Sequence, residues 1–229
     1  MTSDDTRAAF ETFLDRGARG RDWPSWAALF TDDAVYTEHC LGRFVGSAAI
    51  DAWIRSAMKP VACMTFSVEW AIVEDDRVAF WIWNHLPSPV GNDSEFCFPN
   101  LSMLTRAGRR MWSAEEDLYE PAWTACVIDW FRAGGSATMP ADPTLRPLRR
   151  SHPAPPALGP DRRAVAAALR ALAPNGTTLR YDVVEGPVGV GLFDSVDRAY
   201  AVIAHVDGTG TVRFSQVITN PAETRNPFR

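Results

Sequence analysis

Three side chains that could handle protons lie close together on one short segment. Tyr36, Glu38 and His39 fall within a run rich in strand-forming residues. Side chains of a strand alternate between its two faces, so Tyr36 and Glu38 are predicted to share one face and His39 to lie on the other. In an apolar cavity a carboxyl group has a raised pKa and can exchange protons near neutral pH, while a tyrosine can hydrogen-bond a developing enolate oxygen. The segment is therefore a candidate for proton abstraction beside a carbonyl group.

Two later strand-like segments contribute further polar residues. The first carries Asn100 among apolar side chains at its even positions. In the second, the even positions make Glu116 an acid on the more apolar face. A β-bulge would replace Glu116 by Glu115 and Asp117 on that face. We predict that the catalytic residues are Tyr36, Glu38, His39, Glu116 and Asp117.

The chain has nine tryptophans, which is a high proportion for 229 residues. Trp81 and Trp83 share one face of a strand-like run, and Trp112 lies on the last strand of the same region. Such rings could form a wall that binds a ring-shaped ligand, so Trp81, Trp83, Asn100 and Trp112 are predicted to be ligand-binding residues. Packing of these rings beneath the helices is the competing interpretation.

The polar candidates also have structural interpretations. Glu38 could pair with Arg43 or Arg55, and His39 could be a solvated residue at a strand end. Asn100 could bond backbone groups in a turn. A closed cavity with converging ionisable groups would favour the catalytic interpretation over these.

The elements that must position these residues follow from hydrophobic periodicity. Helices are predicted at residues 6–17, 23–30, 47–54, 121–132 and 161–173. Strands are predicted at residues 34–39, 64–73, 77–86, 95–105, 111–119, 178–184, 189–193, 198–205 and 211–219. The glycine-rich residues 186–191 precede a strand and have no Walker lysine, so they are predicted to form a turn and a strand.

Composition narrows the class of partner. A net charge of −5 and a pI near 5.4, without a run of basic residues, argue against binding of nucleic acid or of an anionic membrane. The polar N-terminus and the lack of a long apolar run predict a cytoplasmic protein. The four cysteines are widely spaced and no histidine has metal-ligand spacing, so free thiols and no metal site are expected. A small hydrophobic molecule is the predicted partner.

Proline content divides the chain into three parts. Residues 136–160 contain seven prolines and no hydrophobic periodicity, which is typical of a linker. We predict a first domain at residues 1–135, a proline-rich linker at residues 136–160 and a small α+β extension at residues 161–229. Proteolysis is expected to cut the linker first.

The order of several short motifs resembles a known superfamily. These motifs are Trp26-Ala-Ala-Leu-Phe-Thr-Asp-Asp, Tyr36-x-Glu38-His39, Gly42-x-Phe44-x-Gly46, Ala49-Ile50 and Trp53-Ile54. Together, over residues 5–133, they are similar to the nuclear transport factor 2-like superfamily and to its SnoaL-like branch, which includes polyketide cyclases. The resemblance implies an α+β fold, with a cone-shaped, curved mixed β-sheet wrapped by N-terminal helices. A small C-terminal α+β unit would follow it.

The resemblance also implies a class of activity. Its members include lyases, isomerases and cyclases that need no cofactor and act on small hydrophobic compounds bearing a carbonyl group. The positions that match the family's acid/base residues are Tyr36, Glu38 and the Glu116-Asp117 pair. The pairing of sheets in the family, together with two-sided apolar strands, predicts a homodimer. The alternative is a non-catalytic binding or assembly module; an epoxide-opening hydrolase is disfavoured because no Asp-Arg-Asp arrangement is evident.

Overall fold

Most of the chain forms regular helices and strands. The computed structural model describes residues 2–87, 95–108, 111–119, 129–130, 132–134 and 161–221. The helices are α1 (Ser3–Leu14), α2 (Trp23–Ala27), α3 (Ser47–Met58) and α5 (Arg162–Leu172), with a π-helix at Asp15–Arg19 and a 3-10 helix at Lys59–Val61. The strands are β1 (Phe30–Glu38), β2 (Gly42–Val45), β3 (Thr65–Glu74), β4 (Arg77–Pro87), β5 (Glu95–Arg106), β6 (Trp112–Leu118), β7 (Thr178–Glu185), β8 (Val188–Asp194), β9 (Arg198–Val206) and β10 (Val212–Pro221). The predicted linker and most of the helix predicted at residues 121–132 lie outside the described residues.

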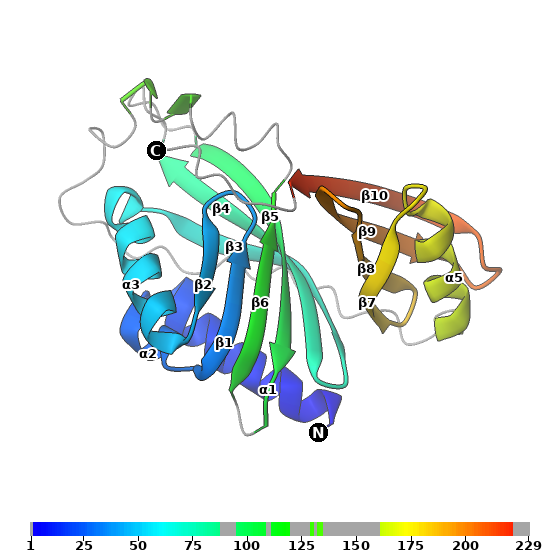
Figure 1. Cartoon of the computed structure of the whole chain (residues 1–229), viewed down its shortest axis with the longest axis horizontal. Helices are drawn as coiled ribbons and strands as arrows, with labels where there is room; N and C mark the ends of the chain where they lie inside the picture. Colours follow the sequence, from blue (N-terminus) through cyan, green and yellow to red (C-terminus); the bar gives the residue numbers. More distant parts are fainter. Residues whose placement is uncertain are drawn as a thin grey trace.

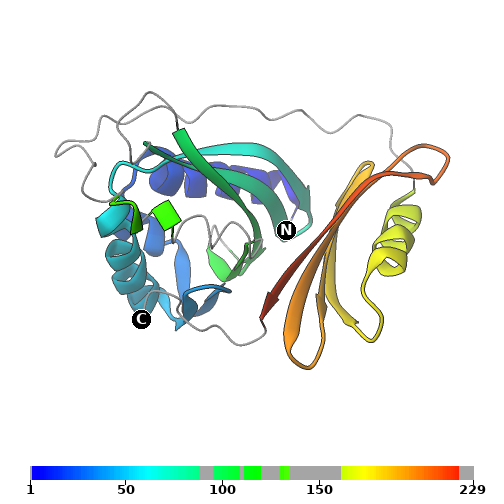
Figure 2. The same cartoon turned by 90° about the horizontal axis from the view of Figure 1, so that it is seen from above.

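Two β-sheets lie face to face, and helices cover the remaining face of each (Figures 1 and 2). The first sheet has six strands in the order β2-β1-β6-β5-β4-β3, and the second has four in the order β10-β9-β8-β7. The first sheet is mixed because β1 and β6 run parallel, whereas its other neighbours are antiparallel. The predicted α+β fold, a curved mixed sheet with N-terminal helices and a C-terminal α+β unit, is confirmed.

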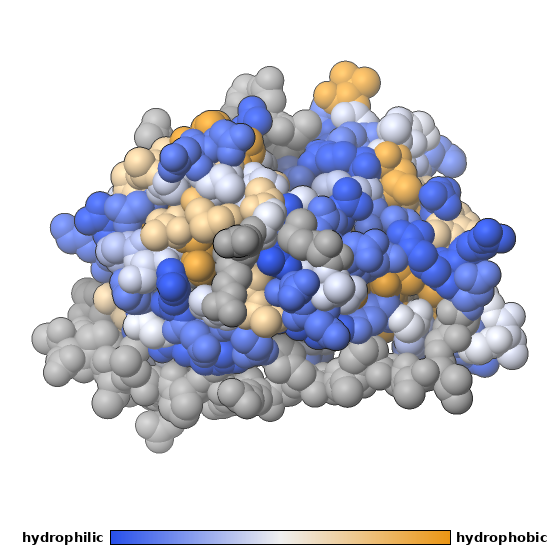
Figure 3. All heavy atoms as spheres, turned by 90° about the horizontal axis from the view of Figure 1, so that it is seen from below, coloured by the Kyte–Doolittle hydropathy of each residue, from blue (hydrophilic) through white to orange (hydrophobic). Residues whose placement is uncertain are grey.

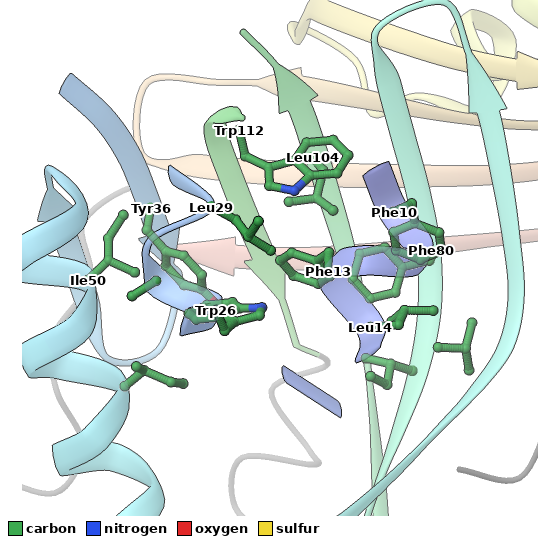
Figure 4. Packing of buried hydrophobic residues seen from close by; sticks show 14 of the residues in the cluster. Phe10, Phe13, Leu14, Trp26, Leu29, Tyr36, Ile50, Phe80, Leu104 and Trp112 are labelled. Carbon is green, nitrogen blue, oxygen red and sulfur yellow. The ribbon is translucent and has the colours of Figure 1, made fainter. Parts of the chain in front are cut away.

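Helix α1 turns an aromatic side toward the concave face of the six-stranded sheet. It begins at a capping box in which Thr2 and Asp5 each accept from the other's backbone. Phe13 lies in the middle of this core (Figure 4), with its ring centroid 6.1 Å from that of Phe80 and 6.0 Å from that of Trp112. Edge-on contacts of this kind add to the burial of the rings and hold α1 over the sheet.

The chain between β2 and α3 makes a tight turn at Gly46. Its φ of 87° lies in the region that favours glycine, and a Cβ there would lie 2.8 Å from the carbonyl oxygen of Asp32. The turn directs α3 back across the concave face, where Ile50 and Ile54 are buried. The helix therefore closes one side of the space beneath the sheet.

The central strands of the six-stranded sheet are apolar on both faces. On β5, Phe98 and Leu104 belong to the core beneath the helices, whereas Leu101 and Met103 belong to a second core between the sheets. Strands that are buried on both faces read as continuous apolar runs. The two-sided pattern predicted as a surface for a second copy of the chain is therefore explained by contact with the C-terminal sheet.

The C-terminal sheet is buried on both of its faces. Val190 and Ile203 pack against the six-stranded sheet, while the opposite face packs against Val165 and Leu169 of α5. At Gly189 an added Cβ would lie 2.6 Å from Cγ1 of Val165, so glycine permits the close approach of α5. The prediction of a turn and a strand at residues 186–191 is confirmed.

The surface differs from this interior. On the face shown in Figure 3, the described residues are mostly hydrophilic and the hydrophobic ones are scattered. No helix in the described part of the chain is long and apolar enough to cross a membrane. Homodimerisation stays a prediction, and it would have to use a surface other than the part of the six-stranded sheet that the C-terminal sheet covers.

A β-bulge in β6 determines which side chains of this strand face the helices. Thr105 pairs with Ala114, but the next residue, Arg106, pairs with Trp112, so Ser113 is an extra residue. Trp112 lies in the core beneath the helices, whereas Leu118, also at an even position, lies in the core between the sheets. The faces of β6 therefore exchange at the bulge.

The domain division at residues 136–160 leads to an expected proteolysis result. Trypsin at low concentration should cut first between Met139 and Leu158, because this stretch alternates arginine and proline without apolar periodicity. The two fragments should still elute together in gel filtration under native conditions, since both contribute to one buried core between the sheets. Separation of the fragments without denaturant would contradict this expectation.

Candidate active site

A cavity of about 980 Å³ lies between the concave face of the six-stranded sheet and the helices. Most of its wall is apolar. The aromatic part of the wall consists of Phe13, Trp23, Trp26, Phe44, Trp53, Phe66, Phe80 and Phe98. The main polar side chains of the wall come from β1, β4, β5 and β6 and from the residue that follows β6. They are Tyr36, Glu38, Asn84, Asn100, Ser102, Glu115, Asp117 and Tyr119. Three carboxyl groups thus face one apolar cavity.

Asp117 is the best hydrogen-bonded carboxylate of the cavity. Tyr36 Oη donates to Oδ2, Ser102 Oγ donates to Oδ1, and Asn100 Nδ2 lies 3.4 Å from the same Oδ1. Burial raises the pKa of Asp117, and the hydrogen bonds from Ser102 and Tyr36 counteract part of this rise. Among the three carboxyl groups, Asp117 is therefore the one in which donors best stabilise a negative charge.

Glu38 lies at the end of β1, with Asp117 as its register partner on β6. Its Oε2 accepts from the backbone N–H of Cys40, at 2.8 Å, and from that of Leu41. Burial and the nearby Asp117 raise the pKa of Glu38 to about 8, against the opposing effect of the two backbone donors. A group with this pKa exists in both protonation states near neutral pH, as proton transfer requires.

Glu115 is the least satisfied of the three carboxyl groups. Its side chain is buried, and Oε2 has no hydrogen-bond partner among the described residues. Burial and the neighbouring Asp117 raise its pKa well above the usual range, which favours the protonated form of Glu115. A buried, protonated carboxyl group without a partner can donate to an oxygen of a bound molecule.

Amide side chains extend the polar network across β4 and β5. Asn84 Nδ2 donates to Asn100 Oδ1 at 2.9 Å, and Asn100 Nδ2 donates to Ser102 Oγ at 2.8 Å. Asn100 therefore supports Asp117 directly and through Ser102. Because each member positions the next, this network holds the carboxylate in one orientation.

Glu116 and His39 lie outside the cavity, which corrects the prediction that Glu38 and Glu116 face one cavity. Glu116 points to the opposite side of β6, where its carboxylate lies 3.3 Å from Nε2 of His39 and 2.5 Å from Nη1 of Arg180. Burial opposes its ionisation, but the hydrogen bonds and charges of His39 and Arg180 prevail and lower its pKa. The physical reason is the β6 bulge, which turns Glu115 and Asp117 inward instead.

The predicted wall of tryptophans is also corrected. Trp81 belongs to the core between the sheets and Trp83 packs against that core, so neither ring lines the cavity. Trp112 lies on the inner side but is wholly buried in packing, without lining the cavity. The rings that do form the aromatic wall come mainly from the N-terminal helices, α3 and the inner positions of the strands.

Four polar residues of the cavity, Asn84, Ser102, Glu115 and Tyr119, were not among the predicted site residues. Glu115 was named only as the consequence of a bulge, and Asn84 and Tyr119 were not singled out. Asn84 shares its face with Phe80 and Ile82, which line the cavity, so the alternation along β4 contained a usable signal. Tyr119 directly follows the last strand residue, and nothing in its local sequence distinguishes it.

The fold and the cavity together define a class of protein: a helix-covered curved sheet that encloses an apolar chamber with buried acids. Residues 10–114 match the family model of the SnoaL-like domain. The match agrees with the resemblance that the sequence motifs show over this part of the chain. No curated protein sequence matches the chain.

Several solved structures are similar to part of the chain. One is TerC co-crystallised with polyporic acid, with 16% identity, a TM-score of 0.47, and coverage of 56% of this chain and 98% of that one. A second is an NTF2-like protein of unknown function from Burkholderia pseudomallei, with 17% identity, a TM-score of 0.46 and coverage of 55% and 96%. A third is an LEH-like epoxide hydrolase from M. tuberculosis, with 19% identity, a TM-score of 0.40 and coverage of 58% and 85%.

Proposed function

We propose that the cavity transfers a proton beside a carbonyl group of a small hydrophobic compound, as an isomerase, lyase or cyclase that needs no cofactor. The observation that carries this proposal is the placement of Glu38, Glu115 and Asp117 in one apolar cavity, where Oε2 of Glu115 has no hydrogen-bond partner among the described residues. Three carboxyl groups in so small a space cannot all ionise, so the cavity holds both a proton acceptor and proton donors.

Glu38 has the geometry of the acid/base residue in this proposal. Two backbone N–H groups hold its Oε2, so the carboxyl group is oriented by the main chain rather than by a flexible partner. In its ionised form it would take the proton from the carbon next to the carbonyl group. The electron pair of that C–H bond would form a C=C bond, and the carbonyl π electrons would move to oxygen, giving an enolate.

Glu115 would stabilise the enolate oxygen in the same step. Its proton is available because Oε2 has no partner among the described residues, and the apolar surroundings strengthen a hydrogen bond to a developing charge. A negative charge on Asp117, which Tyr36 and Ser102 would stabilise as donors, would keep the proton on Glu115. Return of the proton from Glu38 to another carbon gives an isomer, whereas attack of the enolate carbon on a second carbonyl group closes a ring.

A non-catalytic binding module is the second candidate. The aromatic wall and the volume of about 980 Å³ suit a hydrophobic ligand whether or not it reacts. An epoxide-opening reaction through an Asp-Arg-Asp arrangement stays disfavoured, since no arginine lines the cavity that the described residues form.

Deuterium exchange distinguishes these candidates. The protein would be incubated in D2O with the bicyclic ketone 2-tetralone, and deuterium at the carbon next to the carbonyl group would be followed by mass spectrometry. We expect exchange above the buffer rate, and inhibition by the neutral dye N-phenyl-1-naphthylamine at concentrations that match its own fluorescence-measured Kd. Binding of both compounds without added exchange would favour the binding module and contradict the catalytic proposal.

A further inference from the structure

The C-terminal unit holds the strand that carries the cavity acids. We infer that Arg180 and Asn220 are positioning residues of the candidate active site, acting from the C-terminal sheet through the outer side of β6. The inference rests on the proposed function for its catalytic readout. It gives residues 161–221 a part in the site, although none of them lines the cavity.

Arg180 of β7 forms an ion pair with Glu116 on the face of the six-stranded sheet that is turned away from the cavity. Its Nη1 lies 2.5 Å from Oε1 of Glu116, while Nε, at 2.8 Å, and Nη2 both bond the carboxylate of Asp194 on β8. The two-point contact with Asp194 fixes the plane of the guanidinium group. Arg180 therefore links Glu116 of the first sheet to Asp194 of the second, with its own side chain 38% exposed.

The contact at Glu116 restrains the cavity acids because Glu116 lies between Glu115 and Asp117 in sequence. In β6, Glu115 and Asp117 point inward and Glu116 points outward, so any sliding or twisting of β6 moves all three together. His39 Nε2 lies 3.3 Å from the second oxygen of Glu116. Its backbone N–H also donates to the carbonyl oxygen of Asp117 at 3.1 Å, which links the outer contact to the strand itself.

Asn220 of β10 hydrogen-bonds the backbone of Tyr119, the residue that follows β6. Its Oδ1 accepts from the backbone N–H of Tyr119 at 2.9 Å, and its Nδ2 donates to the carbonyl oxygen of Tyr119. Asn220 is only 1% exposed, so both bonds are shielded from water. The side-chain amide thus continues the strand-like bonding past Leu118, where β6 ends, and holds the backbone of a residue whose side chain lines the cavity.

Alignment of β6 matters because Asp117 must meet Tyr36 from β1 and Ser102 from β5 at the same time. Displacement of a reacting group by a fraction of an ångström is enough to lower a rate strongly. Loss of the anchors would therefore lower turnover even where the fold and the apolar cavity remain.

The interface supplies a matched control for this inference. Arg162 also crosses between the two units, where it bonds Glu74 of β3 at 3.0 Å and Asp182 of β7 at 2.9 Å. β3 is the far edge of the six-stranded sheet, three strands from β6 in the order β6-β5-β4-β3. Arg162→Met thus removes an inter-unit ion pair without touching the strand that carries the acids.

The test compares Arg180→Met, Asn220→Ala and Arg162→Met in the full chain. Backbone hydrogen–deuterium exchange of residues 111–119 should rise on the order of tenfold in Arg180→Met and Asn220→Ala, and should be unchanged in Arg162→Met. With 2-tetralone, kcat should fall roughly 10- to 100-fold in the first two variants, while KM and the Kd of N-phenyl-1-naphthylamine change less than about twofold.

A double variant shows whether Arg180 acts through its contact with Glu116 or only through packing between the two sheets. If Arg180 acts through Glu116, the double variant Arg180→Met/Glu116→Gln should catalyse deuterium exchange of 2-tetralone at a rate no lower than that of Arg180→Met alone. Equal protection of residues 111–119 in all three single variants would overturn the inference, whatever the activity. Absence of turnover in the unaltered protein, with the protection difference present, would refute the proposed function and leave the positioning role standing.

Discussion

Replacement of Glu38 by Gln is expected to lower the rate of 2-tetralone exchange by roughly 10²- to 10⁴-fold, the usual loss for a general acid/base residue. Glutamine keeps the shape of the side chain and can still accept from the backbone N–H groups of Cys40 and Leu41, but it cannot take up a proton. The Kd of N-phenyl-1-naphthylamine should therefore stay nearly unchanged. Exchange kinetics and dye fluorescence measure the two quantities separately.

The pH profile identifies the same group. Because the ionised form of Glu38 is the base, kcat/KM should rise with pH and level off above the pKa of about 8. This rise should be absent from the residual activity of Glu38→Gln. Glu69→Gln is the matched control, since Glu69 is an exposed glutamate on the outer side of the same sheet. A profile without a rise near pH 8, or an equal loss in the control, would argue against Glu38 as the base.

The free energy of unfolding is expected to fall as the pH rises from about 5 to about 8. The pKa of Glu38 is about 8 in the folded protein and near 4.5 when the carboxyl group is exposed, so in this range the folded state keeps a proton that the unfolded state has released. The unfolded state then binds fewer protons, and stability decreases with pH. The difference between pKa values of 4.5 and about 8 corresponds to a total loss of about 5 kcal/mol, complete once the pH exceeds the folded pKa.

Urea unfolding at pH 5, 6.5 and 8 measures this loss. Glu38→Gln should reduce the dependence and should be more stable than the unaltered protein at pH 8, because an uncharged group replaces one that burial keeps from ionising. Glu115→Gln should act in the same direction, since burial raises the pKa of Glu115 as well. Equal stability of the unaltered protein at pH 5 and pH 8 would contradict the burial of these acids.

Parts of the site could be predicted from the sequence because local alternation was regular there. Tyr36, Glu38 and Asn100 lie on the cavity side, as the period of two along their strands indicated. On β4 both faces are apolar, so alternation could group Trp81 with Trp83 but could not show which face turns inward. The choice depends on the C-terminal sheet, a partner distant in the sequence.

The acids of β6 show a second limit of local reasoning. An extra residue at Ser113 exchanges the two faces, and its position depends on the pairing of β6 with β5 rather than on any residue type within the strand. Glu115 and Glu116 are chemically identical neighbours, yet burial raises the pKa of the first in an apolar cavity, whereas His39 and Arg180 lower the pKa of the second. A shift of one residue in the register leaves the fold class unchanged, but it changes which carboxyl group faces the cavity.

Because the C-terminal sheet belongs to the same chain, its support of β6 does not depend on protein concentration. A separate subunit in its place would dissociate when its concentration fell below the dissociation constant of the complex. A covalently joined layer instead acts at an effective concentration that dilution of the protein does not change. The contacts of Arg180 and Asn220 with the β6 segment therefore form to the same extent at low and at high protein concentration.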